Sequence, residues 1–439
     1  MSTYKYQISN YHAIQYADIE LKGITVLSGV NGCGKSTISR WLYYIVNVIN
    51  RFDELCFNKA KSQLVNALQQ YFKIYELINS EKEIVSVRTF WETYDSVLSL
   101  NYQNRSSLEL LFDNNANCEN EFEKALAVFF DHPELRIVSQ GQEYRIWNAL
   151  KLRDMSGSYL DRLTAWHNQV IEDREQMKGE FLKMSTERSI SHLASFISSE
   201  YGERDEYPGN IDLLEDGVSV LTSKVGMLLG LDRAIYIDTP MAVTSMDNNP
   251  YWQDLKEMLT TSSNKGDFSK FDEIGKRINE IIGGTISSKS DMISKELYFK
   301  SVNGEEIKLK SAATGIKTFA YLFQLLKNGY LNEKSLLIID EPEAHLHPQW
   351  IVDFAKILIV LHKQLGVKIL LASHNPDMVA ALQSSANKED LQDEINFNIA
   401  KPGDNGKYCF FDLGNDIAEI FDSFNIALDK IEEMGGEDE

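Results

Sequence analysis

The sequence predicts an α/β fold in which a mixed sheet is interrupted by a mainly helical inserted lobe. A short strand, a glycine-rich loop and a helix follow one another within the first 45 residues. Helical stretches dominate from about residue 51 to residue 229, and a strand–helix–strand pattern begins at Ser335. Because parallel strands need a crossover connection, this order predicts one α/β domain, called the head below, that is built from both ends of the chain.

The composition is that of a globular protein. The 439 residues are 43% hydrophobic, which is enough for two or three lobes with cores of their own. No stretch approaches the length of a transmembrane span, and the N-terminus has no signal-peptide pattern. The four cysteines are scattered without a C-x-x-C pair: Cys33, Cys56, Cys118 and Cys409. This usage argues against a disulfide framework or a zinc ribbon, and we expect a cytoplasmic protein without a membrane partner.

The net charge of −21 bears on the choice of partner. A protein that coats DNA usually has a basic balance, so DNA binding is disfavoured but remains an alternative. Along the chain we expect an N-terminal part of the head at residues 1–45 and a mainly helical insertion at residues 46–229. Residues 230–439 would complete the head and end in an acidic tail.

The glycine-rich loop fits the pattern G-x-x-x-x-G-K-[ST], the Walker A motif, position by position. A strand precedes it and a helix follows it, which is the context that distinguishes a phosphate-binding loop from a chance match. Its backbone N–H groups would cradle the phosphates of ATP. We expect the nucleotide-binding residues to be Gly29, Val30, Asn31, Gly32, Cys33, Gly34, Lys35, Ser36 and Thr37.

Three of these residues have more specific expectations. Lys35 would reach the β- and γ-phosphates, and the Ser36 hydroxyl would hold Mg²⁺. Cys33 stands where a small side chain suffices, and a redox role is the alternative.

The inserted lobe contains an apolar stripe at helical spacing between Ala165 and Ser199. The stripe consists of Trp166, Val170, Met177, Phe181 and Met184. Two interpretations stay open: an arm of a short helical hairpin, or an amphipathic helix packed on its own lobe.

The sequence SLLIIDEPEAHLHP, at residues 335–348, supplies a carboxylate pair. A buried strand ends at Asp340, which would hold Mg²⁺ together with Ser36. Glu341 would polarise the attacking water as general base. The next strand, VKILLASH, ends at His374, whose imidazole would contact the γ-phosphate and the water. We therefore expect Glu341 and His374 to be the catalytic residues of an ATPase.

A second turn of small residues opens an amphipathic helix at Ser311–Leu326. A helix N-terminus of this kind suits an anion. The chain already uses its own loop for ATP, so this site would serve a nucleotide held by another subunit. We therefore expect at least a homodimer.

The order of these motifs resembles the ABC-type ATPases of the SMC and recombination-repair branch. DEPEAHLHP together with TGIKTFAYL is more similar to bacterial ABC-type ATPases of overcoming-lysogenization and anti-phage defence systems. Within that group the sequence resembles the ATPase subunit of the PARIS system most, and the Septu and retron-associated ATPases are rivals. The resemblance covers roughly residues 1–45 and 230–400.

The resemblance implies that two heads sandwich two ATP molecules. Thr314 and Gly315 would then face the γ-phosphate on the partner head, with Lys317 nearby. The signature of membrane transporters, Leu-Ser-Gly-Gly-Gln, is replaced here by the five residues from Ala312 to Ile316, which argues against a transport ATPase. His347 stands where many relatives have an aspartate.

Two further positions stay open. The Q-loop glutamine would be Gln140 or Gln142, unless the equivalent strand is IYIDTP at residues 235–240. His345 and His347 form an H-x-H pair, for which zinc binding is one alternative and a packing or interface role is the other.

The resemblance also bears on the effector. Some related chains carry a toprim nuclease after the ATPase, but only 65 residues follow His374 and they lack its Glu and Asp-x-Asp pattern. We expect no nuclease activity in this chain. A separate effector subunit, such as a toprim nuclease, and a phage-encoded trigger are the expected partners. The alternatives are a DNA-clamping repair ATPase and a nucleotide-bound structural protein with almost no turnover.

Overall fold

The structure is a computed structural model of the whole chain. It describes residues 2–79, 87–131, 159–203, 205–222, 224–238, 249–263, 271–290, 295–344 and 346–422. The predictions for Gln140, Gln142, His345 and the acidic tail lie outside these residues.

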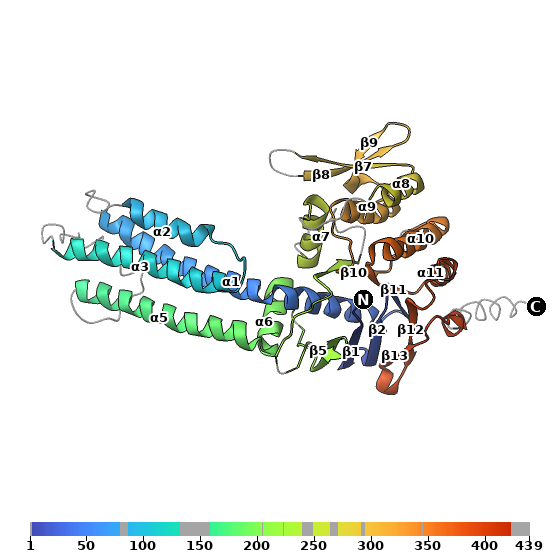
Figure 1. Cartoon of the computed structure of the whole chain (residues 1–439), viewed down its shortest axis with the longest axis horizontal. Coiled ribbons are helices and arrows are strands. Elements are labelled where there is room, and N and C mark those ends of the chain that lie inside the picture. The colour runs from blue at the N-terminus through green and yellow to red at the C-terminus, as the bar shows by residue number, and fades with distance from the viewer. Residues whose placement is uncertain are drawn as a thin grey trace, which may run out of the picture. The chain divides into compact units, whose positions relative to one another are not determined.

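The chain folds into two compact units (Figure 1). Unit 1 comprises Met1–Asn50 and Leu193–Glu439, and unit 2 comprises Arg51–His192. The sequence analysis assigned residues 46–229 to the helical lobe. The structure instead places residues 193–229 in unit 1, because the strand at Asn210–Glu215 pairs with the first strand of the chain.

Unit 1 is built on a ten-stranded mixed sheet in the order β5-β4-β1-β2-β13-β12-β3-β11-β10-β6. The strands are β1 (Tyr4–Tyr11), β2 (Ile14–Leu21), β3 (Ile24–Ser28), β4 (Asn210–Glu215), β5 (Val218–Ser219), β6 (Arg233–Ile237), β10 (Ser335–Asp340), β11 (Lys368–Ser373), β12 (Ile395–Pro402) and β13 (Tyr408–Asp412). The run from β12 to β6 is entirely parallel. The predicted α/β fold with a mixed sheet and a helical insertion is therefore confirmed.

Side-chain alternation gives the central strands two different faces. On one face, alternate residues such as Val26, Ile339 and Leu371 join the large apolar core of unit 1. The helices that cover this face are α7 (Pro250–Thr260), α8 (Phe271–Ile281), α9 (Thr314–Lys327), α10 (Pro348–Leu365) and α11 (Pro376–Lys388).

The opposite face is covered by α1 (Lys35–Asn79), the helix that follows the glycine-rich loop. The ring of Tyr43 on α1 lies 5.7 Å from that of Tyr236 on β6. Two asparagines of α1 also bond the backbone near this edge strand. Asn47 pairs with both the N–H and the C=O of Ala234, and Asn50 donates to the C=O of Leu231.

A second, three-stranded antiparallel sheet belongs to the same unit (Figure 1). Its strands are β7 (Gly284–Ser290), β8 (Lys295–Ser301) and β9 (Glu306–Lys308). The helix α6 (Ile190–Tyr201) stacks the ring of Tyr201 on Tyr44 of α1. Among the described residues, no helix is long and apolar enough to cross a membrane.

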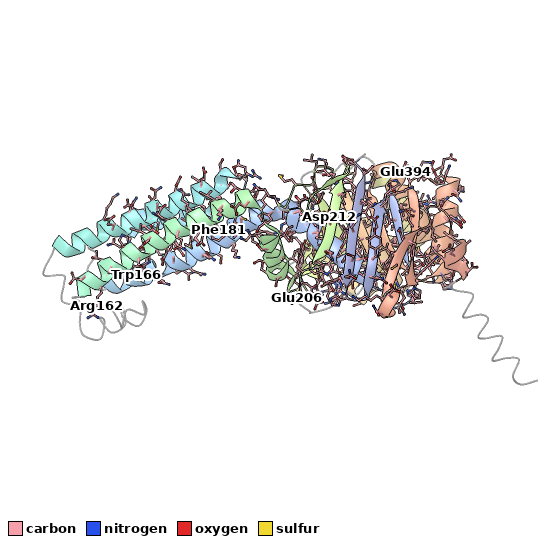
Figure 2. All side chains as sticks on the ribbon, turned by 90° about the horizontal axis from the view of Figure 1, so that it is seen from below. Arg162, Trp166, Phe181, Glu206, Asp212 and Glu394 are labelled. Atoms are coloured by element: carbon pink, nitrogen blue, oxygen red, sulfur yellow. The ribbon has the colours of Figure 1, made fainter. Side chains whose placement is uncertain are left out.

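Unit 2 is helical, as expected. Its helices are the part of α1 after Asn50, α2 (Val87–Ser99), α3 (Ser106–Asp131) and α5 (Tyr159–Glu187). Trp166 and Phe181, labelled on α5 in Figure 2, are buried in the core of this unit, and Met177 packs against it. Of the two interpretations of the apolar stripe, the structure has the amphipathic helix packed on its own lobe.

Candidate functional site

The glycine-rich loop joins the end of β3 at Ser28 to the start of α1 at Lys35. Gly34 has a φ of 104°, a conformation that side chains rarely adopt. A Cβ at this position would lie 2.7 Å from Cγ1 of Ile14, so the space also requires glycine. The loop therefore lies tightly against β2 with its backbone at the N-terminus of α1, where an anion is favoured.

Lys35 is 6% exposed and folds over the loop. Its Nζ donates to the carbonyl oxygens of Gly29 at 2.8 Å and Val30 at 3.1 Å. No carboxylate pairs with this ammonium group among the described residues. A buried cation without an opposite charge is costly, so the loop is electrostatically suited to an anionic ligand.

The Cys33 side chain is fully buried inside the loop. Burial raises the pKa of its thiol, because a thiolate would lose solvation there. A protonated, inaccessible thiol is a poor redox centre, so the geometry favours simple fit over the redox alternative.

The strand that leads into the loop, β3, lies beside β11, the strand that precedes His374, and β11 lies beside β10, which ends at Asp340. In the pairing register, Ser28 lies opposite Ser373, and Asp340 lies opposite Ala372. The residues that follow these strands therefore project from the same carboxyl edge, where α/β proteins commonly bind ligands.

Asp340 is 6% exposed and lies on the face covered by α1. Burial raises the pKa of this carboxyl group, and the nearby hydroxyls of Tyr236, Ser36 and Ser39 oppose the rise. The Tyr236 hydroxyl donates to Oδ2 at 2.7 Å. Oδ1 has no hydrogen-bond partner among the described residues. An orphaned carboxylate oxygen beside a serine hydroxyl fits Mg²⁺, which prefers hard oxygen ligands.

Glu341 has a backbone conformation that is unusual for a residue other than glycine. Its φ is 48°, and its N–H donates to the carbonyl of Ala372 at 2.8 Å. This left-handed conformation costs about 1 kcal/mol. It directs the residue away from the strand, where the Glu341 side chain is 46% exposed.

His374 lies between two carboxylates. Its Nδ1 is 3.7 Å from Oε1 of Glu341 and 3.5 Å from Oε1 of Glu343. Glu343 is buried, and its Oε1 accepts hydrogen bonds from the Ser373 hydroxyl and the His374 N–H. The sequence analysis missed Glu343, although a third acid only two residues beyond Glu341 was a signal.

The predicted signature turn forms the start of α9. Thr314 and Gly315 begin this helix. Its N-cap residue is Ala313, so no side-chain hydrogen bond caps the helix N-terminus. Lys317 is 4% exposed, and burial lowers the pKa of its ammonium group. Within the described residues, the Lys317 ammonium group has no hydrogen-bond or ion-pair partner. Among the described residues, no side-chain hydrogen bond or ion pair joins this helix start to the glycine-rich loop, Asp340 or Glu341.

The open positions are partly resolved. The strand of IYIDTP is β6, which pairs in parallel with β10 and ends beside Asp340, so Asp238 follows the strand at this edge. His347 caps α10, accepting from the N–H of Gln349 at 3.4 Å. Groups of three or more His, Cys, Asp or Glu side chains able to hold a metal ion are absent from the described residues.

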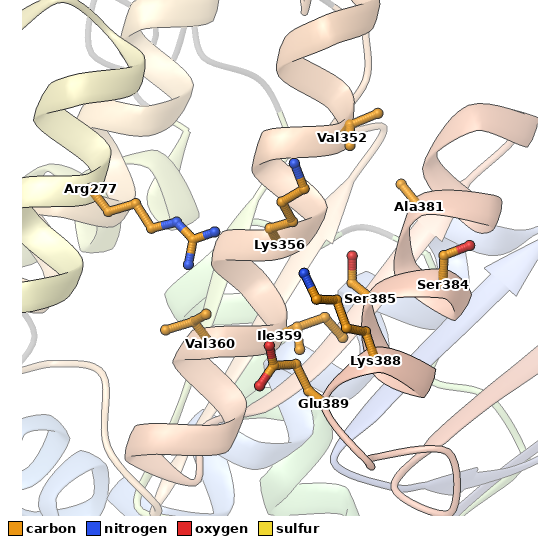
Figure 3. A pocket seen from close by; sticks show the side chains of 10 residues that line it. All are labelled: Arg277, Val352, Lys356, Ile359, Val360, Ala381, Ser384, Ser385, Lys388 and Glu389. Atoms are coloured by element: carbon orange, nitrogen blue, oxygen red, sulfur yellow. The ribbon is translucent and has the colours of Figure 1, made fainter.

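A cavity of about 240 Å³ lies elsewhere on unit 1, between α8, α10 and α11 (Figure 3). Figure 3 shows the cationic side chains of Arg277, Lys356 and Lys388 around apolar residues such as Val360. No residue of the glycine-rich loop or of the carboxylate edge lines it. It is therefore separate from the site described above.

A protein-family model matches part of this chain. Residues 167–379 match the model of a family described as AAA ATPase domain. This match covers 213 of the 439 residues, a little under half of the chain. The matched range contains the carboxylate strand, His374 and the signature turn of that domain.

Curated relatives match shorter parts. The Septu protein PtuA of Bacillus mycoides is 24% identical over 193 residues, which cover 40% of this chain and 26% of PtuA. The energy-coupling factor transporter ATP-binding protein EcfA2 of Clostridium perfringens is 40% identical over 47 residues, covering 11% of this chain and 16% of EcfA2. This chain therefore spans about a quarter or less of the length of the curated relatives it matches.

Solved structures include Smc head domains. One from Pyrococcus furiosus, with an extended coiled coil and bound to the C-terminal domain of ScpA, is 12% identical, with 99% of this chain and all of that chain covered and a TM-score of 0.36. Another, from Pyrococcus yayanosii, is 10% identical, with 97% and 100% covered and a TM-score of 0.38. At these TM-scores the likeness carries no further argument about the ATPase.

Proposed function

We propose that this chain is an ATP-hydrolysing switch of an anti-phage defence system that controls a separate effector subunit. ATP binding would bring two heads together, and hydrolysis would release them. The ATPase subunit of PARIS, AriA, is the nearest named model, and the effector would be a nuclease of the toprim class. The observation that carries the ATPase part is the convergence of Lys35, Asp340, Glu341 and His374 at one sheet edge.

Within one head, each of these residues has a separate task. Lys35 would turn from its two loop carbonyls to the β- and γ-phosphates of ATP. Ser36 and Asp340 would hold Mg²⁺, which neutralises phosphate charge when bound. Glu341, half-exposed at the strand end, would accept the proton of the attacking water.

The proton acceptor has a neighbour that can orient the water. His374 Nδ1 lies within 4 Å of the Glu341 carboxylate, and the buried Glu343 accepts a hydrogen bond from the His374 N–H. Glu343 would therefore act by positioning His374 rather than by touching ATP.

Head association is supported by the start of α9. Lys317 is a buried cation without an opposite charge among the described residues, and it lies in the first turn of the helix after Thr314 and Gly315. A γ-phosphate presented by a second head would supply the missing anion.

Mixing two variants tests this model. Thr314→Arg should leave ATP binding to single heads near normal and lower turnover about 100-fold or more, because a bulky cation would fill the site used by the partner. Lys35→Ala should be inactive for the opposite reason. A mixture of the two should regain turnover, since one composite site of each mixed dimer is intact. Thr222→Arg, an exposed threonine of the same unit, is the matched control.

Full activity of the Thr314→Arg chain alone would refute the cross-subunit site. Failure of the mixture to regain activity would count equally against it.

The defence role is supported by the similarity to the Septu protein PtuA, whose matched share is small. It predicts stable co-purification with the product of a neighbouring gene. The alternative, a DNA clamp, predicts ATP-stimulated DNA binding that weakens steeply with salt. Pull-down of the neighbouring product, with DNA binding at 50 and about 200 mM salt in parallel, separates the two. Salt-sensitive, ATP-stimulated DNA binding without a protein partner would overturn the defence proposal.

A further inference from the structure

Tyr236 shares a face of the sheet with Asp340. It lies opposite Ile338 in the parallel pairing of β6 with β10. Side chains alternate along a strand, so Ile338, Asp340 and Tyr236 all face α1. A tyrosine buried between the sheet and a covering helix needs a partner for its hydroxyl, and here that partner is the Asp340 carboxylate.

The contact is short and buried. Tyr236 is 2% exposed, and its hydroxyl donates to Oδ2 of Asp340 at 2.7 Å. Its ring is held between those of Tyr43 on α1 at 5.7 Å and Tyr251 on α7 at 5.3 Å. The hydroxyl therefore has little freedom to leave the carboxylate.

The strand that carries Tyr236 is itself fixed to α1. Asn47 accepts from the N–H of Ala234 at 2.9 Å and donates to its C=O at 3.0 Å, which completes the outer edge of β6. Ser36 lies on the same helix, three turns earlier. The two proposed metal ligands, Ser36 and Asp340, are thus connected through Asn47, β6 and the Tyr236 hydroxyl.

We propose that Tyr236 is a positioning residue that fixes the Asp340 carboxylate so that Oδ1 is presented to Mg²⁺. The Tyr236 hydroxyl donates to Oδ2, and Oδ1 has no partner among the described residues. One oxygen therefore orients the carboxylate and the other is available to a metal ion, as is common for carboxylate ligands. This inference rests on the proposed ATP site. It gives β6, through Tyr236, the role of orienting the Asp340 carboxylate.

A purely structural tyrosine would leave metal binding unchanged, and the chain offers a matched control. Tyr43 belongs to the same aromatic cluster and is equally buried, but its hydroxyl donates to Asp254 at 2.6 Å. Tyr201 also reaches Asp254, so Tyr43→Phe does not leave that carboxylate without a donor. Tyr236→Phe and Tyr43→Phe each remove one hydroxyl from the same region.

The test is calorimetric titration of ATP into the full chain with EDTA and with Mg²⁺. For Tyr236→Phe we expect unchanged affinity in EDTA and about 10-fold less gain on adding Mg²⁺, because partners of metal ligands typically contribute 10- to 100-fold to metal affinity. The Mg²⁺ concentration for half-maximal turnover should rise by a similar factor. Tyr43→Phe should change neither quantity.

A double variant protects the test against a general loss of stability. If Tyr236 acts through Asp340, Tyr236→Phe should add nothing to the Mg²⁺ defect of Asp340→Asn. An unchanged Mg²⁺ gain in Tyr236→Phe, or an equal additional loss in the Asp340→Asn background, would overturn the inference alone. An unchanged Mg²⁺ gain in Asp340→Asn would instead overturn the proposed metal site.

Discussion

The two units treat buried charge differently. In unit 2, buried charges are paired with each other. Glu119 and Arg174 lie 3.1 Å apart, and Arg188 lies 2.9 Å from Asp53, with each side chain at most 11% exposed. Each pair joins segments of the lobe that are distant in sequence, so the pairs contribute to its arrangement.

In unit 1, three buried charged side chains of the candidate site have no ion-pair partner among the described residues. Lys35 Nζ donates to loop carbonyls and to the Cys33 sulfur, and the Asp340 carboxylate accepts from a tyrosine hydroxyl. The Lys317 ammonium group has no hydrogen-bond or ion-pair partner among the described residues. Each of these side chains is at most 6% exposed. Because an unpaired buried charge is destabilising, this difference indicates that the head gives up stability to keep a charged ligand site.

The largest effect on ATP binding is expected at Lys35, one of the unpaired buried charges of unit 1. Lys35→Ala should lower ATP affinity about 100-fold or more, because it removes charge-assisted hydrogen bonds worth about 1.5–3 kcal/mol each. It should at the same time leave the head no less stable without nucleotide, since the lysine has no opposite charge there. Calorimetry and thermal unfolding measure the two effects.

Lys368→Ala is the control for loss of a buried lysine, because Lys368 begins β11 and so lies at the opposite end of this strand from the candidate site. Normal ATP affinity in Lys35→Ala would contradict the assignment of the phosphate loop.

A somewhat smaller effect is expected at the carboxylate pair. Glu341→Gln should bind Mg²⁺-ATP normally but hydrolyse it about 10²- to 10⁴-fold more slowly, because the amide cannot accept a proton. The stalled heads should stay associated. Asp340→Asn should instead weaken Mg²⁺-ATP binding itself. Turnover and light scattering with and without Mg²⁺-ATP distinguish the two, and near-normal turnover of Glu341→Gln would point to His374 as the base.

Much of this site could be predicted from sequence, for a local reason. The Walker A loop, the Asp340–Glu341 pair and His374 each end or follow a strand whose apolar run is visible without the fold. Tyr236 and Asn47 could not be predicted, because their partners lie 104 and 187 positions away in the chain. Their roles exist only once β6 lies beside β10 and α1.

The fold shows the same limit. The parallel strands β10 and β11 were predicted, since continuous apolar runs mark them locally. The lobe boundary at residue 229 differs from the structure because β4 and β5 are short, and β4, which β5 flanks, pairs with β1 about 200 residues earlier. The helix expected after the loop is also longer, because α1 continues without a break from Lys35 to Asn79.

A third prediction sharpens the contrast within unit 1. Glu343→Gln should lower turnover about 10-fold without changing ATP affinity, because the amide holds the Ser373 hydroxyl and the His374 N–H less strongly. If Glu343 acts only through His374, the double variant with His374→Ala should be no slower than His374→Ala alone. Additive losses in steady-state turnover would mean that Glu343 has an independent role.

The smallest effect on ATP turnover is expected in unit 2. Burial raises the pKa of Glu119 to about 7, although Arg174 and Asn115 oppose the rise. Its pKa in the unfolded chain is near the ordinary 4.5. Between these values the folded lobe binds more protons than the unfolded chain, so stability is fully present below pH 4.5 and is lost as pH rises through 7. The size of the loss is about 3 kcal/mol.

Glu119→Gln should remove this pH dependence and leave ATP turnover within about twofold of normal. Hydrogen exchange of α3 and α5 in the full chain, corrected for intrinsic rates, measures the stability of the lobe between pH 5 and about pH 8. Burial lowers the pKa of the neighbouring His167, which acts in the opposite direction but is present in both proteins. Glu109→Gln, exposed on the same helix, should behave as the unmodified chain. A strong loss of turnover in Glu119→Gln would show that the paired charges of the lobe serve the ATP site as well, and the distinction between the two units would fail.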